Sequence, residues 1–182
     1  MTCHTVPVTS DPLRPLLDAA AEGDDRAVAE LVRRTQPAVW RLCLALGSDG
    51  EVEDLVQETY LQALRGAGRY RGDAPVQAWL LGIARHVCAD HVRRRQRHRR
   101  LVDRVGRTAS VEARRVEPVG GTADLVERLH PDRRDAFVLT QMVGLSYEEA
   151  ATVLGCPIGT IRSRVARARD DLLTALREAE AR

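Results

Sequence analysis

Residues 145–164 read LSYEEAATVLGCPIGTIRSR, and their pattern predicts the local structure of the C-terminal part of the chain. Ser146 can accept a hydrogen bond from a free backbone N–H at the start of a helix, and Glu149, three residues later, completes a capping box. Gly155 supplies the left-handed conformation that often ends a helix, and Pro157 suits the first turn of the next one. The stretch therefore predicts two helices joined by a tight turn.

The second of these helices presents a basic face. Apolar side chains recur every three or four residues and form its buried stripe: Ile158, Ile161, Val165, Ala168 and Leu172. The side chains outside that stripe are Thr160, Arg162, Ser163, Arg164 and Arg167. Arginine can bind guanine edges or phosphates, and serine and threonine can bind either group. The pattern is typical of a helix-turn-helix with its recognition helix, although a helical hairpin with a solvated arginine face would share it. A preceding helix at about 131–143, ending at Gly144, would complete a three-helix domain.

Helical periodicity also dominates the N-terminal half, where we expect helices within 15–47, at 51–65 and from Val76 into the arginine run at 93–100. The helix at 51–65 has an apolar stripe made of Val52, Leu55, Val56, Thr59 and Ala63. A second stripe at the same spacing is made of Asp54, Gln57, Glu58 and Leu61. The pattern alone leaves this second stripe open as solvated surface or as a docking face.

Basic charge is concentrated in the middle of the chain. Residues 93–121 carry ten arginines against three acidic residues, whereas residues 1–92 and 122–182 each carry a small net negative charge. Residues 98–122 also lack sustained apolar periodicity and contain several glycines, so we expect a flexible basic linker there. The predicted fold is all-α: two small helical domains joined by this linker, the C-terminal one a helix-turn-helix.

The sequence gives no sign of a membrane segment, a metal site or a cofactor. It contains no apolar run long enough to span a membrane and no signal-peptide pattern, so we expect the protein in the cytoplasm. Four cysteines are widely spaced and lack a paired metal motif, and in a reducing compartment we expect free thiols. His86, Asp90 and His91 lie close in sequence, but their spacing does not bring all three to one helix face.

Three blocks of the chain resemble bacterial sigma factors of the extracytoplasmic-function group. DLVQETY at 54–60 is similar to the D-L-V-Q-E-T-F block of the family's second region. WLLGIARH at 79–86 is similar to its W-L-x-x-I-A-R-N block, and GTIRSRVARAR at 159–169 is similar to the G-T-V-x-S-R-x-x-R-A-R signature of its fourth region. Three blocks in order and at family-like spacing are more specific than a single helix-turn-helix.

The resemblance implies a dissociable subunit of RNA polymerase that is not an enzyme. After a loose tail at 1–12, residues 13–97 would form region 2, which binds the clamp helices of the polymerase β′ subunit and reads and melts the −10 promoter element. Residues 98–122 would thread through the polymerase, and residues 123–182 would form region 4, which reads the −35 element. The implied partners are core RNA polymerase, through β′ and β, and promoter DNA. Whether an anti-sigma factor is a further partner stays open.

The resemblance also assigns roles to individual residues. It implies that the stripe of Asp54, Gln57, Glu58 and Leu61 binds polymerase, and that the basic face of Thr160, Arg162, Ser163, Arg164 and Arg167 binds the −35 element. For the −10 element the candidates are Tyr70, Arg71, Arg85 and His86. His86 stands where the family more often has asparagine, which leaves the base preference there open. We expect Trp79 to pack mainly in the core, since it lies on the face of Val76 and Leu80.

Two other classes of protein fit less well. A conventional helix-turn-helix regulator would need a receiver or ligand domain upstream, and the all-helical N-terminal half with its block at 54–60 matches neither. A nucleic-acid-processing enzyme would need a carboxylate cluster with metal spacing, a nucleophile–base pair or a phosphate-binding glycine loop, and the sequence shows none of these. Binding of core polymerase in the absence of DNA would distinguish a sigma factor from a simple regulator.

Overall fold

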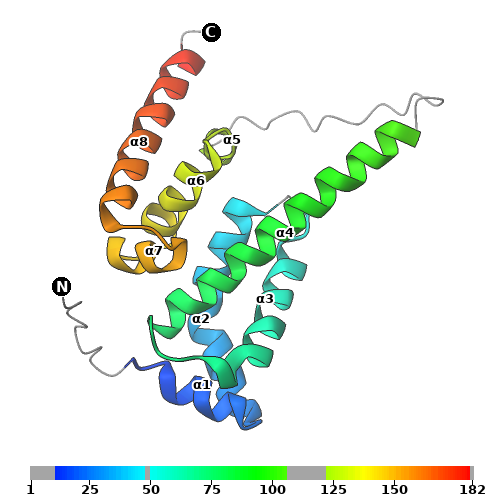
Figure 1. Ribbon diagram of the computed structural model, residues 1–182, viewed down its shortest axis with the longest axis vertical. Helices are drawn as coiled ribbons and strands as arrows, with labels where there is room; N and C mark the ends of the chain where they lie inside the picture. The colour runs from blue at the N-terminus through cyan, green and yellow to red at the C-terminus, as the bar shows by residue number, and fades with distance from the viewer. Residues whose placement is uncertain (1–10, 48–49, 106–121, 181–182) are drawn as a thin grey trace.

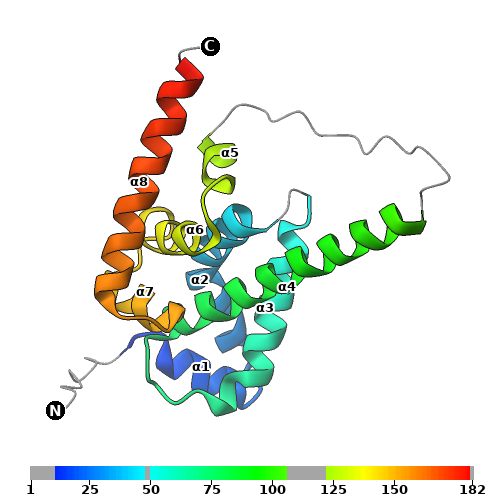
Figure 2. The ribbon, with the colours of Figure 1, turned by 45° about the horizontal axis from the view of Figure 1, so that its top comes forward.

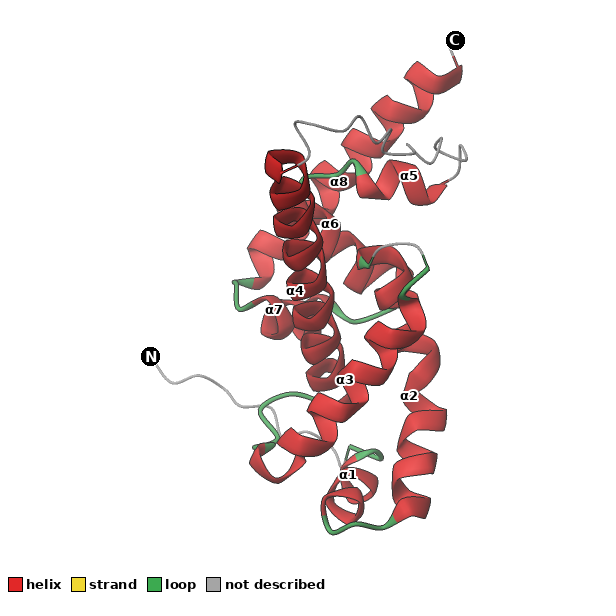
Figure 3. Cartoon of the chain, turned by 90° about the vertical axis from the view of Figure 1, so that its right-hand side faces the viewer, coloured by secondary structure: helices red, strands yellow, loops and turns green. Residues whose placement is uncertain are grey.

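The structure is a computed structural model that describes residues 11–47, 50–105 and 122–180. These ranges contain helices and turns and no strand, which confirms the predicted all-α class (Figure 3). The N-terminal unit consists of α1 (Arg14–Ala21), α2 (Asp25–Leu46), α3 (Val52–Gly66), the short 3-10 helix η1 (Ala67–Arg69) and α4 (Val76–Val105). The C-terminal unit consists of α5 (Thr122–Glu127), α6 (Pro131–Phe137), the π-helical turn η2 (Val138–Met142), α7 (Tyr147–Leu154) and α8 (Ile158–Glu180) (Figure 1).

Helices α2, α3 and α4 pack against one another around the core of the N-terminal unit. The apolar stripe predicted for residues 51–65 is confirmed, because its five members are all buried in α3. Between α2 and α3 the hydroxyl groups of Thr35 and Tyr60 are hydrogen-bonded at 2.8 Å and buried. This bond satisfies two polar groups that would otherwise be costly inside an apolar core.

The helical segment expected within residues 15–47 is two helices, α1 and α2. Gly23 has a φ of +94°, a left-handed conformation that favours glycine and turns the chain between the helices. Asp24 then caps α2, since its side chain accepts hydrogen bonds from the backbone N–H groups of Arg26 and Ala27. These two local features separate helices whose apolar periodicity alone looked continuous.

The long helix α4 extends further than expected. It runs to Val105, so residues 98–105, which we assigned to the linker, are helical. Arginine is a good helix former, and this part of α4 needs no apolar stripe because it projects beyond the bundle into solvent (Figure 1). Residues 106–121 of the predicted linker and residues 1–10 of the predicted tail at 1–12 lie outside the described residues, and Thr122, the last residue of the predicted linker, begins α5.

The helix-turn-helix forms as its caps predict. Ser146 Oγ accepts a hydrogen bond from the N–H of Glu149 at 3.1 Å, while the Ser146 N–H donates to Glu149 Oε2 at 2.8 Å. Gly155 ends α7 with a φ of +61°. Along α8 the central members of the predicted stripe are fully buried, and its two end members, Ile158 and Leu172, are half-buried. The preceding helix, expected at 131–143, is present as α6 and η2, and its last five residues widen into a π turn.

The two units pack together. Helix α7 lies against the first half of α4, while η2 and α5 lie against α2 (Figures 1 and 2). A single apolar cluster contains buried side chains from both units, among them Leu42 and Leu81 from the first unit and Leu139, Ala150 and Ile161 from the second. None of the helices in the described ranges is both long and apolar enough to cross a membrane.

The capping box predicts a measurable effect on stability. Ser146→Ala should lower the free energy of unfolding by about 1 kcal/mol, because it removes the side-chain acceptor for the Glu149 N–H. Urea denaturation followed by circular dichroism would measure this loss. Ser163→Ala is the matched control: Ser163 lies inside α8 and caps nothing, so its replacement should leave stability unchanged or slightly raised. Equal losses in both variants would contradict the capping role.

Candidate nucleic-acid interface

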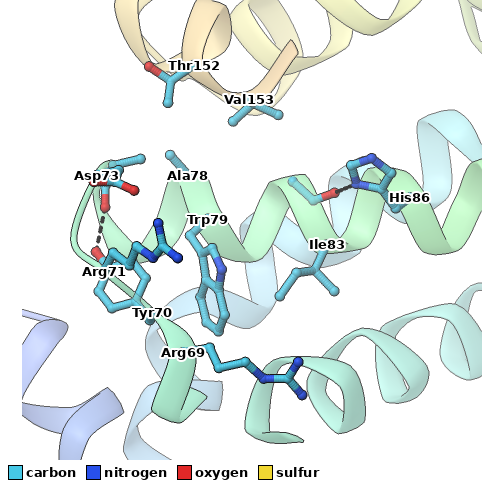
Figure 4. Close-up of a pocket in the computed structure, with 12 residues that line it drawn as sticks. Arg69, Tyr70, Arg71, Asp73, Ala78, Trp79, Ile83, His86, Thr152 and Val153 are labelled. Carbon is cyan, nitrogen blue, oxygen red and sulfur yellow. Dashed lines mark hydrogen bonds between the residues drawn. The ribbon is translucent and has the colours of Figure 1, made fainter. Parts of the chain in front are cut away.

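A cavity of about 490 Å³ lies beside the loop that joins α3 to α4, at the start of α4 (Figure 4). Its lining combines the exposed arginines Arg69 and Arg71 with the aromatic rings of Tyr70 and Trp79. Farther along α4 it is lined by Ile83 and His86, and α7 of the C-terminal unit contributes Thr152 and Val153. The cavity therefore joins cationic groups to aromatic surfaces, the combination that binds unpaired nucleotides.

Tyr70 fixes the shape of the loop. Its hydroxyl donates a hydrogen bond to the Ala74 carbonyl, and its ring centroid lies 5.1 Å from that of Trp79 with the planes tilted by 48°. The Arg14 guanidinium from α1 lies 4.8 Å from the Tyr70 centroid, within the range of a cation–π contact. Burial raises the pKa of Tyr70, and the nearby Asp11 carboxylate adds to the rise. The phenol therefore stays neutral and keeps the O–H group that donates to the Ala74 carbonyl.

Trp79 has two environments. We expected it to pack mainly in the core, and one part of the ring does pack against the buried cluster of Leu17, Leu31 and Leu80. The side chain is nevertheless half-buried and lines the cavity beside Tyr70 (Figure 4). Val76 and Leu80, which share this face of α4, are fully buried, and the spacing of the three residues gave no sign that Trp79 differs from them.

The four predicted −10 residues do not all lie together. Tyr70, Arg71 and His86 line the cavity. His86 is exposed, and its Nδ1 lies 2.7 Å from the carbonyl oxygen of Gly82, so it acts as the donor of that hydrogen bond. Arg85 is not among the residues that line the cavity: its Nε donates to Asp135 Oδ2 of α6 at 2.6 Å. The structure thus brings three of the four together and holds the fourth against the C-terminal unit.

The polar stripe of α3 lies on the surface. Asp54, Gln57 and Leu61 are exposed and Glu58 is half-buried, with Glu58 accepting a hydrogen bond from Gln62 at 2.8 Å. Neither carboxylate of the stripe forms an ion pair with another residue of the described ranges. The stripe therefore offers acidic groups and an apolar side chain, Leu61, which is 41% exposed, to a partner.

The basic face of α8 is divided between free and engaged side chains. Arg162, Ser163 and Arg167 are exposed, whereas Thr160 and Arg164 are half-buried. The Arg164 guanidinium donates to Asp132 of α6 at 3.0 Å and lies 3.7 Å from the Cys156 sulfur in the turn before α8. Arg164 therefore ties the recognition helix to its own domain, and the spacing pattern that grouped it with Arg162 did not show this.

The described residues offer no arrangement for a metal ion. No group of three or more His, Cys, Asp or Glu side chains in these ranges could hold one. Cys43 and Cys88 are buried free thiols and Cys156 is a half-buried one. The fourth cysteine, Cys3, lies outside the described residues.

Comparison with known proteins agrees with the geometry. The Sigma-70 region 2 family model matches residues 31–98, and the Sigma-70 region 4 model matches residues 122–172. The ECF RNA polymerase sigma factor SigC of Mycobacterium tuberculosis is 44% identical over 163 residues, which cover 85% of this chain and 86% of that protein. The chain belongs to the extracytoplasmic-function group of sigma factors. As a sigma factor, it directs promoter-specific initiation of transcription.

Further relatives support the same family. The ECF RNA polymerase sigma-E factor of Escherichia coli is 31% identical over 174 residues, which cover 85% of this sigma factor and 89% of that one. The structure of CnrH in complex with the cytosolic domain of CnrY matches with a TM-score of 0.70 and 32% identity, covering 91% of this chain and 97% of that chain. RpoE from Bartonella quintana, solved with the anti-sigma factor NepR, matches with a TM-score of 0.64 and 31% identity over 82% and 96% of the two chains.

The split between free and engaged arginines predicts different mutant effects on α8. In the holoenzyme, Arg162→Ala should weaken promoter binding by roughly 1–3 kcal/mol and relax selectivity at one −35 position, if its exposed guanidinium reads a base edge. Arg164→Ala should leave selectivity unchanged and lower stability by about 0–1 kcal/mol, because its ion pair lies within the domain at the surface. Competition binding with single-base −35 variants measures the selectivity of both variants, and urea denaturation followed by circular dichroism measures their stability. A uniform loss on every sequence would make Arg162 a phosphate contact.

Proposed function

We propose that this sigma factor docks on core RNA polymerase through the α3 stripe of Asp54, Gln57, Glu58 and Leu61, and that it reads promoters with two separate surfaces. The cavity of Tyr70, Arg71, Trp79 and His86 takes the −10 element, and the exposed face of α8 takes the −35 element. The protein supplies no chemistry of its own, because polymerase carries out nucleotide transfer. Working with polymerase places it in the cytoplasm.

The observation that carries this proposal is the pairing of Tyr70 with Trp79 inside a cavity bordered by Arg69 and Arg71. Turning a base out of a duplex costs a few kcal/mol of unstacking. Stacking on an aromatic side chain returns about 1–3 kcal/mol per base, and arginines at the rim can bind the flanking phosphates. Because Tyr70 and Trp79 both line the cavity, their rings lie where an unpaired base could stack.

The docking role is supported by the exposed side chains of the α3 stripe, which a partner protein can reach. Its acidic groups have no ion-pair partner within the described ranges, and Leu61 adds an exposed apolar group, so a basic partner helix would meet both charge and apolar contact. Such complementarity speeds and orients association.

We further propose an anti-sigma partner, supported by the likeness to RpoE, which was solved with the anti-sigma factor NepR. In vitro transcription with core polymerase on a promoter library tests the function as a whole.

Charge reversal on the stripe should abolish polymerase binding. In the double variant Asp54→Arg/Glu58→Arg, repulsion should replace attraction toward a basic partner, while the fold persists because the stripe lies on the surface. Size-exclusion chromatography with core polymerase measures assembly, and circular dichroism checks the fold. The matched control is Glu22→Arg/Asp25→Arg, which makes the same charge change at exposed positions near the α1–α2 turn. Holoenzyme assembly by the stripe variant would refute the docking role.

Replacing Trp79 should reduce promoter melting and leave assembly of the holoenzyme unchanged. Trp79→Ala should lower open-complex formation by roughly 5- to 150-fold, which corresponds to the loss of about 1–3 kcal/mol of stacking on one base. Permanganate reactivity of melted thymines measures this step. Trp40→Ala is the control, since Trp40 is also half-buried but lies on α2 outside the cavity. If both variants lose activity equally, Trp79 acts through the fold and not through DNA.

A further inference from the structure

The carboxylate of Asp11 ties the first helix of the N-terminal unit to the start of α4. Its Oδ1 accepts a hydrogen bond from the Leu13 N–H at 2.9 Å, directly before α1, and its Oδ2 accepts one from the Val76 N–H at 2.6 Å. Val76 is the first residue of α4, where a backbone N–H has no partner within the helix. Pro75, the residue before it, has no side-chain acceptor, so Asp11 supplies the cap from 65 residues away.

Helix α1 also contacts the loop at residues 70–75, which joins η1 to α4 beside the cavity. The Arg14 guanidinium lies over the Tyr70 ring, 4.8 Å from its centroid. It is also close to Gly72, where an added Cβ would lie 3.1 Å from Arg14 Nη1. Gly72 has a φ of +80°, so the loop adopts a left-handed conformation at the point that Arg14 covers. Hydrogen bonds at 2.9 Å from the Arg14 Nε to both carboxylate oxygens of Asp18 hold the guanidinium in this position.

Apolar packing holds α1 against the start of α4. Leu17 of α1 is fully buried in one cluster with Val76 and Leu80 of α4. Neither Asp11 nor Arg14 is among the residues that line the cavity. These two side chains therefore touch the loop and the end of α4 without lining the space that a nucleotide would occupy.

We propose that α1 is a brace for the loop at 70–75, and that Asp11 and Arg14 are positioning residues for capture of the −10 element. The proposal rests on the function proposed for the cavity. A loop that is ordered before DNA binds loses less conformational entropy when a base enters, so more of the stacking energy contributes to affinity. Asp11 fixes the end of the loop at Val76, and Arg14 fixes the end at Tyr70, whose ring lines the cavity. The segment before α2 consequently contributes to promoter melting without touching the melted strand.

Removal of the Asp11 carboxylate should loosen the loop. The probe is the fluorescence of Trp79, which is the one tryptophan left in a Trp40→Phe background because the chain has two. In Asp11→Ala, acrylamide should quench this fluorescence more strongly than in the parent. The matched control is Asp24→Ala, which removes a carboxylate cap whose hydrogen bonds lie within the start of α2, and its quenching should equal that of the parent. Unchanged quenching in Asp11→Ala would refute the brace, whatever the function of the cavity.

The same substitutions test the positioning role in the holoenzyme. Asp11→Ala should lower open-complex formation by roughly 10- to 100-fold, the span expected for one lost hydrogen bond to a charged group, and should relax selectivity among single-base −10 variants. Binding of core polymerase and −35 selectivity should stay unchanged. Asp11→Asn keeps a carbonyl acceptor for the Val76 N–H, so its loss should be smaller. Equal losses in Asp11→Ala and Asp24→Ala would show a general effect on the fold and overturn the positioning role.

The Trp79→Ala variant separates failure of the brace from failure of the proposed function. If Trp79→Ala reduces melting and Asp11→Ala does not, the cavity takes the −10 element but the positioning role is refuted. If neither variant reduces melting, the function proposed for the cavity is refuted, together with the positioning role that rests on it.

Discussion

Helix α4 sends neighbouring side chains into the core, into the cavity and into the contact between the two units. Successive residues of a helix are separated by about 100°, so a short segment points to every side. Leu80, Leu81 and Ala84 are fully buried in the cores, while Trp79 turns partly toward the cavity and Arg85 reaches α6. A rotation of α4 would therefore disturb the core, the cavity and the contact between the units together.

Features set by neighbouring residues were predictable from the sequence. The capping box of Ser146 and Glu149 and the left-handed turn at Gly155 depend on side chains within a few positions, and all are present. The apolar stripes of α3 and α8 were predictable for a similar reason, since burial follows the 3.6-residue period. The composition of the cavity was predictable only in part, because Tyr70 lies inside the loop whereas Trp79 combines core and cavity environments.

Features set by distant residues or by solvation were not predictable. Arg85 and Asp135 are fifty residues apart in sequence, and no local pattern shows that they meet. Arg164 resembles Arg162 in spacing, yet its bond to Asp132 depends on how α6 packs against α8. Residues 98–105 are helical although their sequence shows no apolar stripe, because that part of α4 projects beyond the other helices (Figure 1), and apolar periodicity predicts only helices that bury one face.

The placement of α3 orders the events that the proposed roles require. Helices α3 and α7 lie on opposite sides of α4 (Figures 1 and 3), so α7 borders the cavity and leaves the stripe of Asp54, Gln57 and Leu61 exposed. Under the proposed roles, the docking surface is therefore free in this arrangement, whereas α7 stands beside the cavity proposed for −10 DNA. Separating the two units would expose apolar side chains that they bury together, so the free energy of such a separation would have to come from contacts made afterwards. Under the proposed roles, docking would therefore precede separation of the two units, because the bound complex offers both units alternative partners for the surfaces they share.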